Sequence, residues 1–249
     1  MVTDLTGKVA VVTGGTRGIG FATVRALAEV GAIVVLTGRD EASAKERAAE
    51  VAAEYDANVT GVALDVTDSK AVATVIRAVA KEHGKLDVVV ANAGVLEDAL
   101  VGMIRDELVE KMLTTNVAGT IYTVQAAARS MMRKKSGAIV VLASIVGEKG
   151  SAGQTAYAAS KAAVGNIARS TAKELGRYGI RVNGVAPGVI ETAMTSHLGD
   201  EILEGRIADT ALARLGKAEE VAKAIRFLVS DEASFVTGQI LGVDGGLVL

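Results

Sequence analysis

Short, almost uniformly apolar segments alternate with longer amphipathic segments along most of this chain, and this alternation limits the folds that it can adopt. The apolar segments have the length of β-strands and lack the alternating polar positions of strands that face water. The longer segments have the length and periodicity of helices. We expect strands over Val9–Val12, Ile33–Thr37, Val59–Leu64, Leu86–Ala91, Ala138–Ala143, Arg181–Val185 and Gln239–Val243, and helices over Gly18–Val30, Glu41–Glu54, Ser69–His83, Glu107–Arg133, Thr155–Arg177 and Ala218–Ser230.

Strands buried on both faces, with helices between them, predict an α/β fold with a doubly wound parallel sheet of seven strands and right-handed crossovers. The 249 residues contain one proline and no repeat or Pro/Ser-rich linker, so we expect a single domain over residues 1–249. The segment at about 190–216 breaks the alternation with scattered polar and small residues. We interpret it as a substrate lid.

The composition excludes several classes of function. The formal net charge is −2 and no Lys/Arg block is present, so we expect neither nucleic acid nor an anionic membrane as a partner. The chain has no cysteine, which excludes disulfides and thiolate metal sites, and we expect no metal. It begins without a basic-then-apolar signal and has no apolar run of about 18 residues, so we expect a cytoplasmic protein.

A glycine-rich loop follows the first predicted strand and opens the first predicted helix. It has the form Gly14-x-x-x-Gly18-x-Gly20, with Thr16, Arg17 and Ile19 between the glycines. Gly14 suits a tight turn, Gly18 allows backbone to approach a pyrophosphate, and Gly20 lets the helix lie close to the sheet. The helix N-terminus then offers N–H groups to phosphates. Three glycines after a strand also suit a plain turn, so the neighbouring motifs decide the interpretation.

Two arginines near this loop favour NADPH over NADH. Arg17 lies in the loop, and Arg39 follows the second predicted strand, where Gly38 replaces the acidic residue that an NAD site uses for the ribose 2′-OH. Two guanidinium groups suit a 2′-phosphate. Two alternatives stay open: Asp40 takes the acidic role, or both arginines are solvated surface charges.

Two further strand ends offer contacts for a dinucleotide. After the third strand, the Asp65 carboxylate can accept from an adenine amino group while the Val66 amide meets the ring. Asp65 can equally cap the following helix. After the fourth strand, Asn92-Ala93-Gly94 provides small residues against which a cofactor can lie, although a plain strand-to-helix turn has the same composition.

Tyr157 and Lys161 are four residues apart on a predicted helix and therefore share a face. A nearby ammonium favours phenolate, so we expect Lys161 to lower the pKa of Tyr157. Tyr157 can then protonate the oxygen formed when hydride reaches a carbonyl carbon, and Lys161 can also bind the nicotinamide ribose. Ser144 ends the fifth strand, where open sheets bind ligands, and can hold the substrate oxygen. The Tyr-x-x-x-Lys pattern alone is weak, because such pairs are common on exposed helices.

Asn116 is a polar residue within an otherwise apolar helical segment. It is either a satisfied structural amide or the holder of a water that relays protons to Lys161.

Together these residues resemble the short-chain dehydrogenase/reductase family over essentially the whole chain. The resemblance implies a Rossmann-type sheet in the order 3-2-1-4-5-6-7 and a catalytic tetrad of Asn116, Ser144, Tyr157 and Lys161. It also implies that the segment Pro187-Gly188-x-Ile190-x-Thr192 binds the nicotinamide, through backbone at Ile190 and the Thr192 hydroxyl. One departure is Ala91, where the family usually has asparagine before Asn92-Ala93-Gly94.

Four segments carry a closer likeness within this family: Thr13–Gly20, Val185–Thr192, Ser230–Ser234 and Val243–Gly246. Through them the chain is most similar to bacterial-type 3-oxoacyl-[acyl-carrier-protein] reductases. That resemblance implies NADP(H), reduction of a 3-oxoacyl thioester in fatty-acid synthesis, a homotetramer, and an acidic acyl carrier protein that docks beside the site entrance. Arg129 and Lys173 fall at the matching docking positions, and a solvated helix face is the alternative for both. Small and apolar residues in excess on the helices at 107–133 and 155–177 suggest a subunit interface, unless the monomer itself buries them.

Several alternative functions stay open at this point. An acetoacetyl-CoA reductase or another alcohol, sugar or steroid dehydrogenase shares these motifs. A non-catalytic dinucleotide sensor on the same fold is a hypothesis of another class. Glu97 and Met194 are candidates for lining the substrate pocket.

Overall fold

The computed structural model describes residues 3–193, 195 and 199–248. Its main feature is a parallel sheet of seven strands in the order β3-β2-β1-β4-β5-β6-β9, which confirms the expected 3-2-1-4-5-6-7 arrangement with β9 as the seventh strand. The strands are β1 (Val9–Val12), β2 (Ile33–Gly38), β3 (Val59–Ala63), β4 (Val88–Ala91), β5 (Gly137–Leu142), β6 (Ile180–Pro187) and β9 (Ile240–Val243). Strands β1 and β4 are buried at every position, as continuous apolar runs require.

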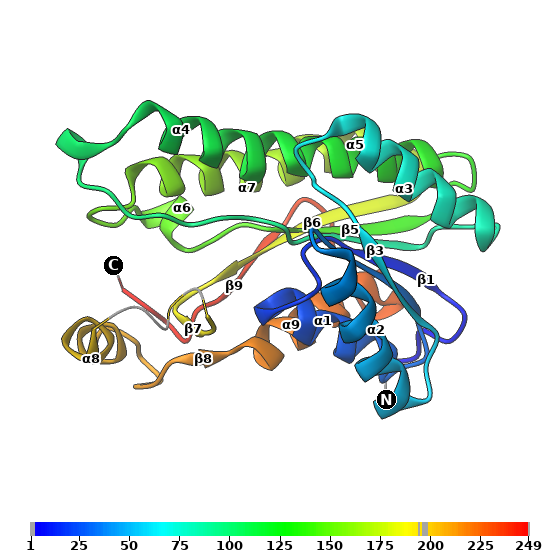
Figure 1. The fold of residues 1–249 in the computed structure, drawn as a ribbon, viewed down its shortest axis with the longest axis horizontal. Coiled ribbons are helices and arrows are strands. Elements are labelled where there is room, and N and C mark those ends of the chain that lie inside the picture. The colour runs from blue at the N-terminus through cyan, green and yellow to red at the C-terminus, as the bar shows by residue number, and fades with distance from the viewer. Residues whose placement is uncertain (1–2, 194, 196–198, 249) are drawn as a thin grey trace.

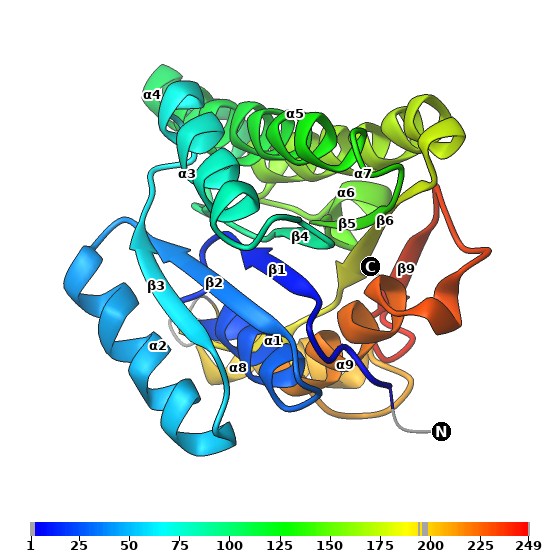
Figure 2. The same cartoon turned by 90° about the vertical axis from the view of Figure 1, so that its right-hand side faces the viewer.

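Helices cover both faces of this sheet, as Figure 2 shows. One apolar cluster joins the sheet to α1 (Gly18–Ala28), α2 (Glu41–Tyr55) and α9 (Ala218–Val229). The other cluster joins the opposite face to α3 (Ser69–Glu82), α5 (Gly119–Met131) and α7 (Thr155–Leu175). Two separate apolar layers on one sheet are the expected result of strands that are apolar on both faces.

The helix predicted over Glu107–Arg133 is wrong as a single regular helix. The structure divides this stretch into α4 (Asp106–Met112), a π-helical segment η2 (Leu113–Ala118) and α5. A π-helix inserts one residue into a turn without changing the apolar character of the sequence, so hydrophobic periodicity does not reveal it. The irregular segment contains Asn116, and such segments are frequent at functional sites.

The segment at 190–216 lies outside the main sheet, and its two ends form a small sheet of their own. Strand β7 (Ile190–Glu191) pairs with β8 (Gly216–Lys217), so the two ends of the segment lie side by side. Between them, α8 (Asp200–Ala208) lies at one end of the molecule (Figure 1). Shorter elements complete the chain: η1 (Val101–Met103), α6 (Val146–Lys149), η3 (Gly176–Tyr178) and η4 (Asp231–Ala233).

The small residues that suggested a subunit interface are only in part buried within the monomer. Ala126, Ala127 and Val164 are buried, and Ala162 is exposed. Burial in the monomer therefore accounts for these three buried residues, and a subunit interface stays a prediction. Among the described residues, no helix has the length and apolarity to cross a bilayer.

Candidate active site

The glycine loop connects β1 to α1 at the carboxyl edge of the sheet. Gly14 has a φ of 64°, and a Cβ there would lie 2.9 Å from Ala93 Cα. A Cβ on Gly20 would lie 2.2 Å from the Gly14 carbonyl oxygen, so only glycine fits where the helix meets the loop. Arg17, the residue at the helix N-cap, makes no side-chain capping bond, which leaves the first N–H groups of α1 uncapped by a side chain. The expected roles of Gly14 and Gly20 agree with this geometry.

A hydrogen-bond network fixes the loop to the end of β4. The Asn92 amide nitrogen Nδ2 donates to the Thr13 and Gly14 carbonyls, at 2.9 Å each. In return, the Thr13 hydroxyl accepts from the backbone N–H groups of Asn92 and Ala93 at 3.1 and 3.2 Å. Asn92 and Ala93 therefore lie at the loop as predicted, with the Asn92 side chain holding the loop. Sequence reasoning assigned no role to Thr13, because one threonine after a strand carries no distinct signal.

At the end of β2, the space beside Gly38 is too small for an acidic side chain. A Cβ on Gly38 would lie 2.6 Å from Thr16 Cγ2, so aspartate or glutamate does not fit without displacement of the loop. Asp40 caps α2, because its carboxylate accepts from Ser43 N at 2.7 Å. The carboxylate that was the alternative partner for the ribose 2′-OH is therefore already bonded to the helix. Arg17 and Arg39 are exposed at this edge. These two guanidinium groups make the edge beside β2 positively charged.

Asp65 lies at the end of β3 and is already engaged by its own turn. Its Oδ1 accepts from Thr67 N at 2.9 Å and from Thr67 Oγ1 at 2.8 Å, and these bonds, with the charge of Arg39, hold the pKa of Asp65 below its usual value. Asp68, not Asp65, caps α3. Val66 is buried, and a Cβ on Gly119 would lie 2.8 Å from its Cγ2.

Ser144, Tyr157 and Lys161 meet where β5 ends beside the first turns of α7. The Tyr157 hydroxyl is hydrogen-bonded to the Ser144 side chain. Lys161 Nζ lies 5.7 Å from the centroid of the Tyr157 ring. Ser144 and Lys161 are each 7% exposed. Gly94, in the segment after β4, lies beside them, since a Cβ there would lie 3.5 Å from Lys161 Nζ. The structure brings the three predicted catalytic side chains together.

The expected effect of Lys161 on the pKa of Tyr157 is wrong for this geometry. Desolvation raises the pKa of Tyr157 to about 12, the hydrogen bond with Ser144 opposes this, and the negative charge of Asp98 adds to it. Burial lowers the pKa of the Lys161 ammonium to about 8. Lys161 Nζ donates to the Leu142 carbonyl at 2.7 Å. At pH 7 the phenol is protonated and most of the ammonium is charged.

Asn116 is a satisfied amide in the π-helical segment η2. Its Nδ2 donates to Val95 O at 2.9 Å and to Ser160 Oγ at 3.0 Å, while its Oδ1 accepts from Val95 N at 2.8 Å. The side chain is 1% exposed. These bonds attach the segment after β4 to α7, one residue before Lys161. The side-chain contacts of Asn116 are thus those of a satisfied structural amide, the first of its two interpretations.

The segment after β6 borders the glycine loop from the opposite side. A Cβ on Gly18 would lie 3.5 Å from Thr192 Cγ2, so Thr192 reaches the loop. Several polar backbone groups here have partners within the chain: Ile145 N donates to Pro187 O at 3.1 Å, Gly188 N to Val243 O at 3.1 Å, and Thr195 Oγ1 to Ile190 O at 2.7 Å. Met194, a predicted pocket residue, lies outside the described residues.

Asp98 and Gln154 approach the site although sequence reasoning did not select them. Gln154 Nε2 donates to Asp98 Oδ1 at 2.9 Å, and Ala99 N donates to Gly153 O at 2.8 Å. The two segments are 56 residues apart, and no spacing or periodicity relates them. Glu97, the other predicted pocket residue, forms an ion pair with Lys111 at 2.9 Å, and this pairing lowers its pKa.

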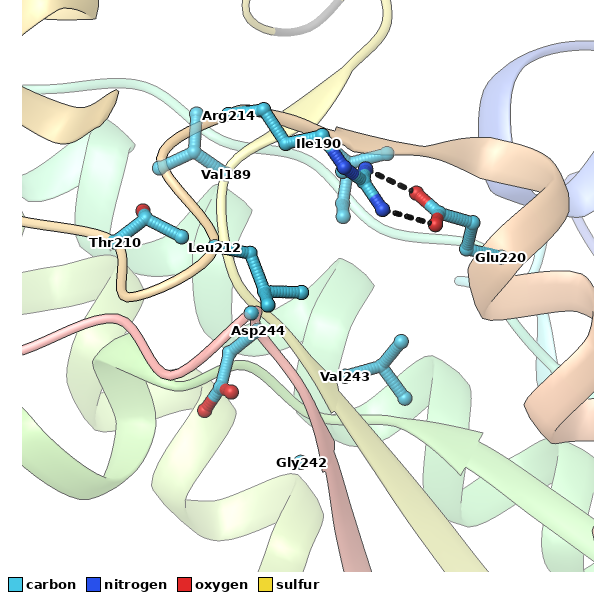
Figure 3. Close-up of a pocket in the computed structure, with 11 residues that line it drawn as sticks. Val189, Ile190, Thr210, Leu212, Arg214, Glu220, Gly242, Val243 and Asp244 are labelled. Atoms are coloured by element: carbon cyan, nitrogen blue, oxygen red, sulfur yellow. Dashed lines mark hydrogen bonds and ion pairs between the residues drawn. The ribbon is translucent and has the colours of Figure 1, made fainter. Parts of the chain in front are cut away.

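A cavity of about 180 Å³ lies beside the β7–β8 pair, as Figure 3 shows. Val189, Ile190, Leu212 and Val243 give it apolar walls. At its edge the Arg214 guanidinium pairs with both Glu220 carboxylate oxygens, at 2.8 and 2.6 Å, and lowers the pKa of Glu220 to about 2. The cavity contains none of the predicted catalytic residues and adjoins the 190–216 segment. Over the described part of the chain, no group of acidic or histidine side chains has the arrangement of a metal site.

The two predicted docking residues lie near the ends of α5 and α7. Arg129 is exposed in the last turn of α5, and Lys173 is exposed near the end of α7. A helix rises about 1.5 Å per residue, so Lys173 is about 24 Å along the axis from Tyr157. Docking of a carrier protein at these two residues stays a prediction.

The doubly wound sheet, the glycine loop and the Tyr157–Lys161 pair define the class of protein: a dinucleotide-dependent oxidoreductase. A family model described as enoyl-(acyl carrier protein) reductase matches residues 14–248. The 3-oxoacyl-[acyl-carrier-protein] reductases of Chlamydia muridarum and Escherichia coli are 41% and 40% identical, each over 98% of both chains. A short-chain type dehydrogenase/reductase from Mycobacterium ulcerans superimposes with a TM-score of 0.94 at 33% identity, covering 98% of this chain and 90% of that one. The chain belongs to the short-chain dehydrogenase/reductase family.

Proposed function

We propose that this chain is an NADPH-dependent 3-oxoacyl-[acyl-carrier-protein] reductase, which converts a 3-oxoacyl thioester to the 3-hydroxyacyl product in fatty-acid synthesis. The observation that carries the proposal is the Ser144–Tyr157 hydrogen bond beside buried Lys161, at the sheet edge that also holds the glycine loop. The names of the relatives from Chlamydia muridarum and Escherichia coli supply the substrate.

The residues at this edge fit a dinucleotide with a 2′-phosphate. The tight glycine loop and the uncapped N-terminus of α1 suit the pyrophosphate, in a segment formed by Gly14, Thr16, Arg17, Gly18, Ile19 and Gly20. The steric limit at Gly38 and the helix-capping role of Asp40 favour Arg17 and Arg39 as partners of a 2′-phosphate. We assign the adenine to Asp65 and Val66, and the nicotinamide half to the segments at 92–94, 187–192 and the Tyr157–Lys161 pair.

NADPH, when bound, supplies the hydride for carbon 3 of the substrate. Tyr157 Oη then transfers its proton to the ketone oxygen, which becomes the alcohol oxygen of the product. A pKa of about 12 keeps this proton on Tyr157 until the oxygen becomes basic. Ser144 Oγ donates a hydrogen bond that holds the same oxygen. Lys161 binds the nicotinamide ribose, and Asn116 positions the helix that carries both Tyr157 and Lys161.

The identity of the acyl carrier belongs to the proposal. Relatives named for acyl-carrier-protein substrates favour a protein carrier over CoA. Because Lys173 is about 24 Å along α7 from Tyr157, docking at Arg129 and Lys173 serves this site only through a long acyl arm or from a neighbouring subunit. Charge reversal at both residues should raise KM for carrier-bound substrate and leave the CoA thioester unaffected. A KM for carrier-bound substrate that is unchanged in the variant would exclude docking there.

The single domain with a lid at about 190–216 is a further part of the proposal. The two-residue β7–β8 pairing supports it, because both ends of the segment meet at one narrow attachment. A homotetramer, implied by the resemblance, and a cytoplasmic location, expected from the sequence, complete the proposal. Light scattering tests the first, and fractionation of cells tests the second.

A panel of substrates tests the function. NADPH and NADH oxidation should be measured with acetoacetyl carrier protein, acetoacetyl-CoA, an aliphatic ketone, a sugar ketone, a steroid ketone and a crotonoyl thioester. We expect the highest kcat/KM with NADPH and the carrier-bound 3-oxoacyl thioester. Preference for the CoA thioester would indicate an acetoacetyl-CoA reductase, and reduction of the crotonoyl double bond would match the description of the family model. Cofactor binding without turnover of any compound would indicate a sensor.

A further inference from the structure

Residues 245–248, called here the β9 extension, lie against residues 209–212, which directly follow α8. Thr210 and Leu247 form an antiparallel β-bridge. Three backbone hydrogen bonds join the two segments on either side of this bridge: Val248 N to Asp209 O at 3.0 Å, Ala211 N to Gly246 O at 3.4 Å and Leu212 N to Gly245 O at 3.1 Å. The segment at 190–216 is therefore attached to the chain after β9 as well as at the β7–β8 pair.

Two glycines allow the β9 extension to approach this closely. Gly245 and Gly246 have φ angles of 64° and 75°, in the left-handed region that favours glycine. A Cβ on Gly245 would lie 2.8 Å from Thr210 Cγ2. A Cβ on Gly246 would lie 2.9 Å from Ala211 Cβ. These glycines end the Val243–Gly246 motif of the sequence, and the chemistry of the proposed function does not use them. Close packing against residues 210–211 gives them a role.

This pairing holds residues 209–212 where the apolar core does not. Among the described residues, neither apolar cluster of the sheet contains a side chain from this stretch. The 180 Å³ cavity lies behind it instead, since Thr210 and Leu212 both line that cavity (Figure 3). Leu212 is 63% exposed, whereas Leu247 of the β9 extension is 6% exposed. Leu247 thus supplies the buried apolar side chain of the pair.

Helix α8, just before residues 209–212, contacts the loop that precedes the catalytic helix. Thr210 Oγ1 donates to Arg206 O at 2.7 Å, and Arg206 Nη2 donates to Ser151 Oγ at 3.0 Å. Ser151 lies in the loop between α6 and α7, and α7 carries Tyr157. In Figure 1 the chain after β9 runs toward the end of the molecule where α8 lies. The β9 extension is therefore connected to this loop through the last turn of α8.

We propose that the β9 extension is a positioning element of the active site. It holds α8 against the loop at Ser151 and thereby sets the affinity for substrate without touching the substrate. Gly245, Gly246 and Leu247 are its positioning residues. This inference rests on the proposed function, which makes the segment at 190–216 a lid over an acyl thioester, and it adds the element that keeps the lid in place.

The expected effect is on substrate affinity. A backbone hydrogen bond contributes about 10-fold to an equilibrium, so separating one of the three bonds should weaken the paired arrangement by about that factor. The apparent affinity for substrate falls with the population of the arrangement that binds it. Substrate that is bound restores the pairing, so kcat should change little.

Gly246→Ala, in the full chain, tests the inference because the added Cβ meets Ala211 Cβ. Gly84→Ala is the matched control. Gly84 has a φ of 68°, but a Cβ there has no neighbour within 4 Å, so this variant carries the backbone strain without the contact. The double variant G246A/A211G removes the Cβ that the new one meets. Each protein is compared by amide hydrogen exchange at Leu212 and Val248, by kcat and KM for acetoacetyl thioester with saturating NADPH, and by light scattering.

We expect Gly246→Ala to lower the exchange protection of the Leu212 and Val248 amides by about 10-fold and to raise KM by about 10-fold, with kcat within about 2-fold of the wild type. Gly84→Ala should keep all these quantities within about 2-fold. The double variant should return KM to within about 3-fold of the wild type, because the backbone strain at Gly246 remains.

An unchanged KM in Gly246→Ala would overturn the inference, whether or not exchange protection is lost. An equal rise of KM in Gly84→Ala, or a rise in Gly246→Ala without loss of protection, would place the effect elsewhere and overturn it too. A changed oligomeric state that persists in the double variant would assign the β9 extension to a subunit contact, with the same consequence. Failure of the proposed function differs from these outcomes: the wild type then oxidises NADPH with no 3-oxoacyl thioester, and KM is compared for the carbonyl compound that it does reduce.

Discussion

Replacing the buried ammonium of Lys161 by the neutral side chain of methionine should change stability in a pH-dependent way. Burial lowers the pKa of Lys161 from 10.5 to about 8. Each pKa unit corresponds to about 1.4 kcal/mol, so keeping the charge buried costs about 3 kcal/mol at pH 7. The substitution also leaves the Leu142 carbonyl without its donor, which costs about 1–3 kcal/mol. At pH 7, Lys161→Met should therefore be as stable as the wild type or more stable, although it abolishes activity.

The pH dependence separates the cost of the buried charge from the cost of the lost hydrogen bond, because only the cost of the charge changes with pH. Below pH 8 the folded and unfolded chains both hold the proton on Lys161, and the cost is complete. Between pH 8 and 10.5 the unfolded chain holds it and the folded chain does not, so the stability of the wild type rises with pH. At pH 9.5 less than half of the cost remains. The wild type should thus gain about 2 kcal/mol relative to Lys161→Met between pH 7 and pH 9.5.

Urea unfolding measures the difference in unfolding free energy between the wild type and Lys161→Met. Both proteins are unfolded without nucleotide, at pH 7, 8.5 and 9.5 and at one protein concentration. Other groups titrate equally in both proteins, so the difference reports Lys161. The raised pKa of Tyr157 destabilises the folded state only above pH 10, outside this range. A free-energy difference that stays constant from pH 7 to 9.5 would refute the argument that the Lys161 charge is buried at a cost.

Three further substitutions test other parts of the site. Arg39→Asp should reverse the preference between NADPH and NADH in kcat/KM, and a retained NADPH preference would exclude Arg39 as the partner of the 2′-phosphate. Asn116→Ala should lower the free energy of unfolding by about 2 kcal/mol, because Val95 loses two hydrogen bonds; an unchanged urea midpoint would contradict this. Gly38→Ala should destabilise by about 1–3 kcal/mol through contact with Thr16 Cγ2, and Thr16→Ser should restore the stability; failure of that rescue in thermal unfolding would exclude the contact.

The sheet and the glycine loop could be predicted because their determinants are local. A strand such as β4, with the sequence Val-Val-Val-Ala, has only one environment that suits it, namely burial on both faces. Gly14 and Gly20 are separated by a spacing that a strand, a tight turn and a helix impose together. The predicted sheet order came from the family resemblance, because the alternation of strands and helices fits more than one order.

Other features depend on contacts between distant residues. The pKa of Tyr157 was expected to fall because Lys161 follows it by one helical turn, but desolvation by the folded chain outweighs a neighbour visible in the sequence. The Asp98–Gln154 pair joins loops with no common pattern. The π-helical segment around Asn116 adds one residue to a turn, and an apolar stretch does not record that addition. Strands β7 and β8 have two residues each, too few for a periodicity.

The most direct test of the chemistry removes the proton donor and leaves the ring. Tyr157→Phe keeps the volume of the side chain, so NADPH should bind with a Kd within about 2-fold of the wild type in a fluorescence titration. The kcat/KM for a 3-oxoacyl thioester at pH 7 should fall by about 10²- to 10⁴-fold, the contribution typical of a general acid. A variant that binds NADPH normally and keeps kcat/KM within a few-fold of the wild type would show that the proton comes from elsewhere.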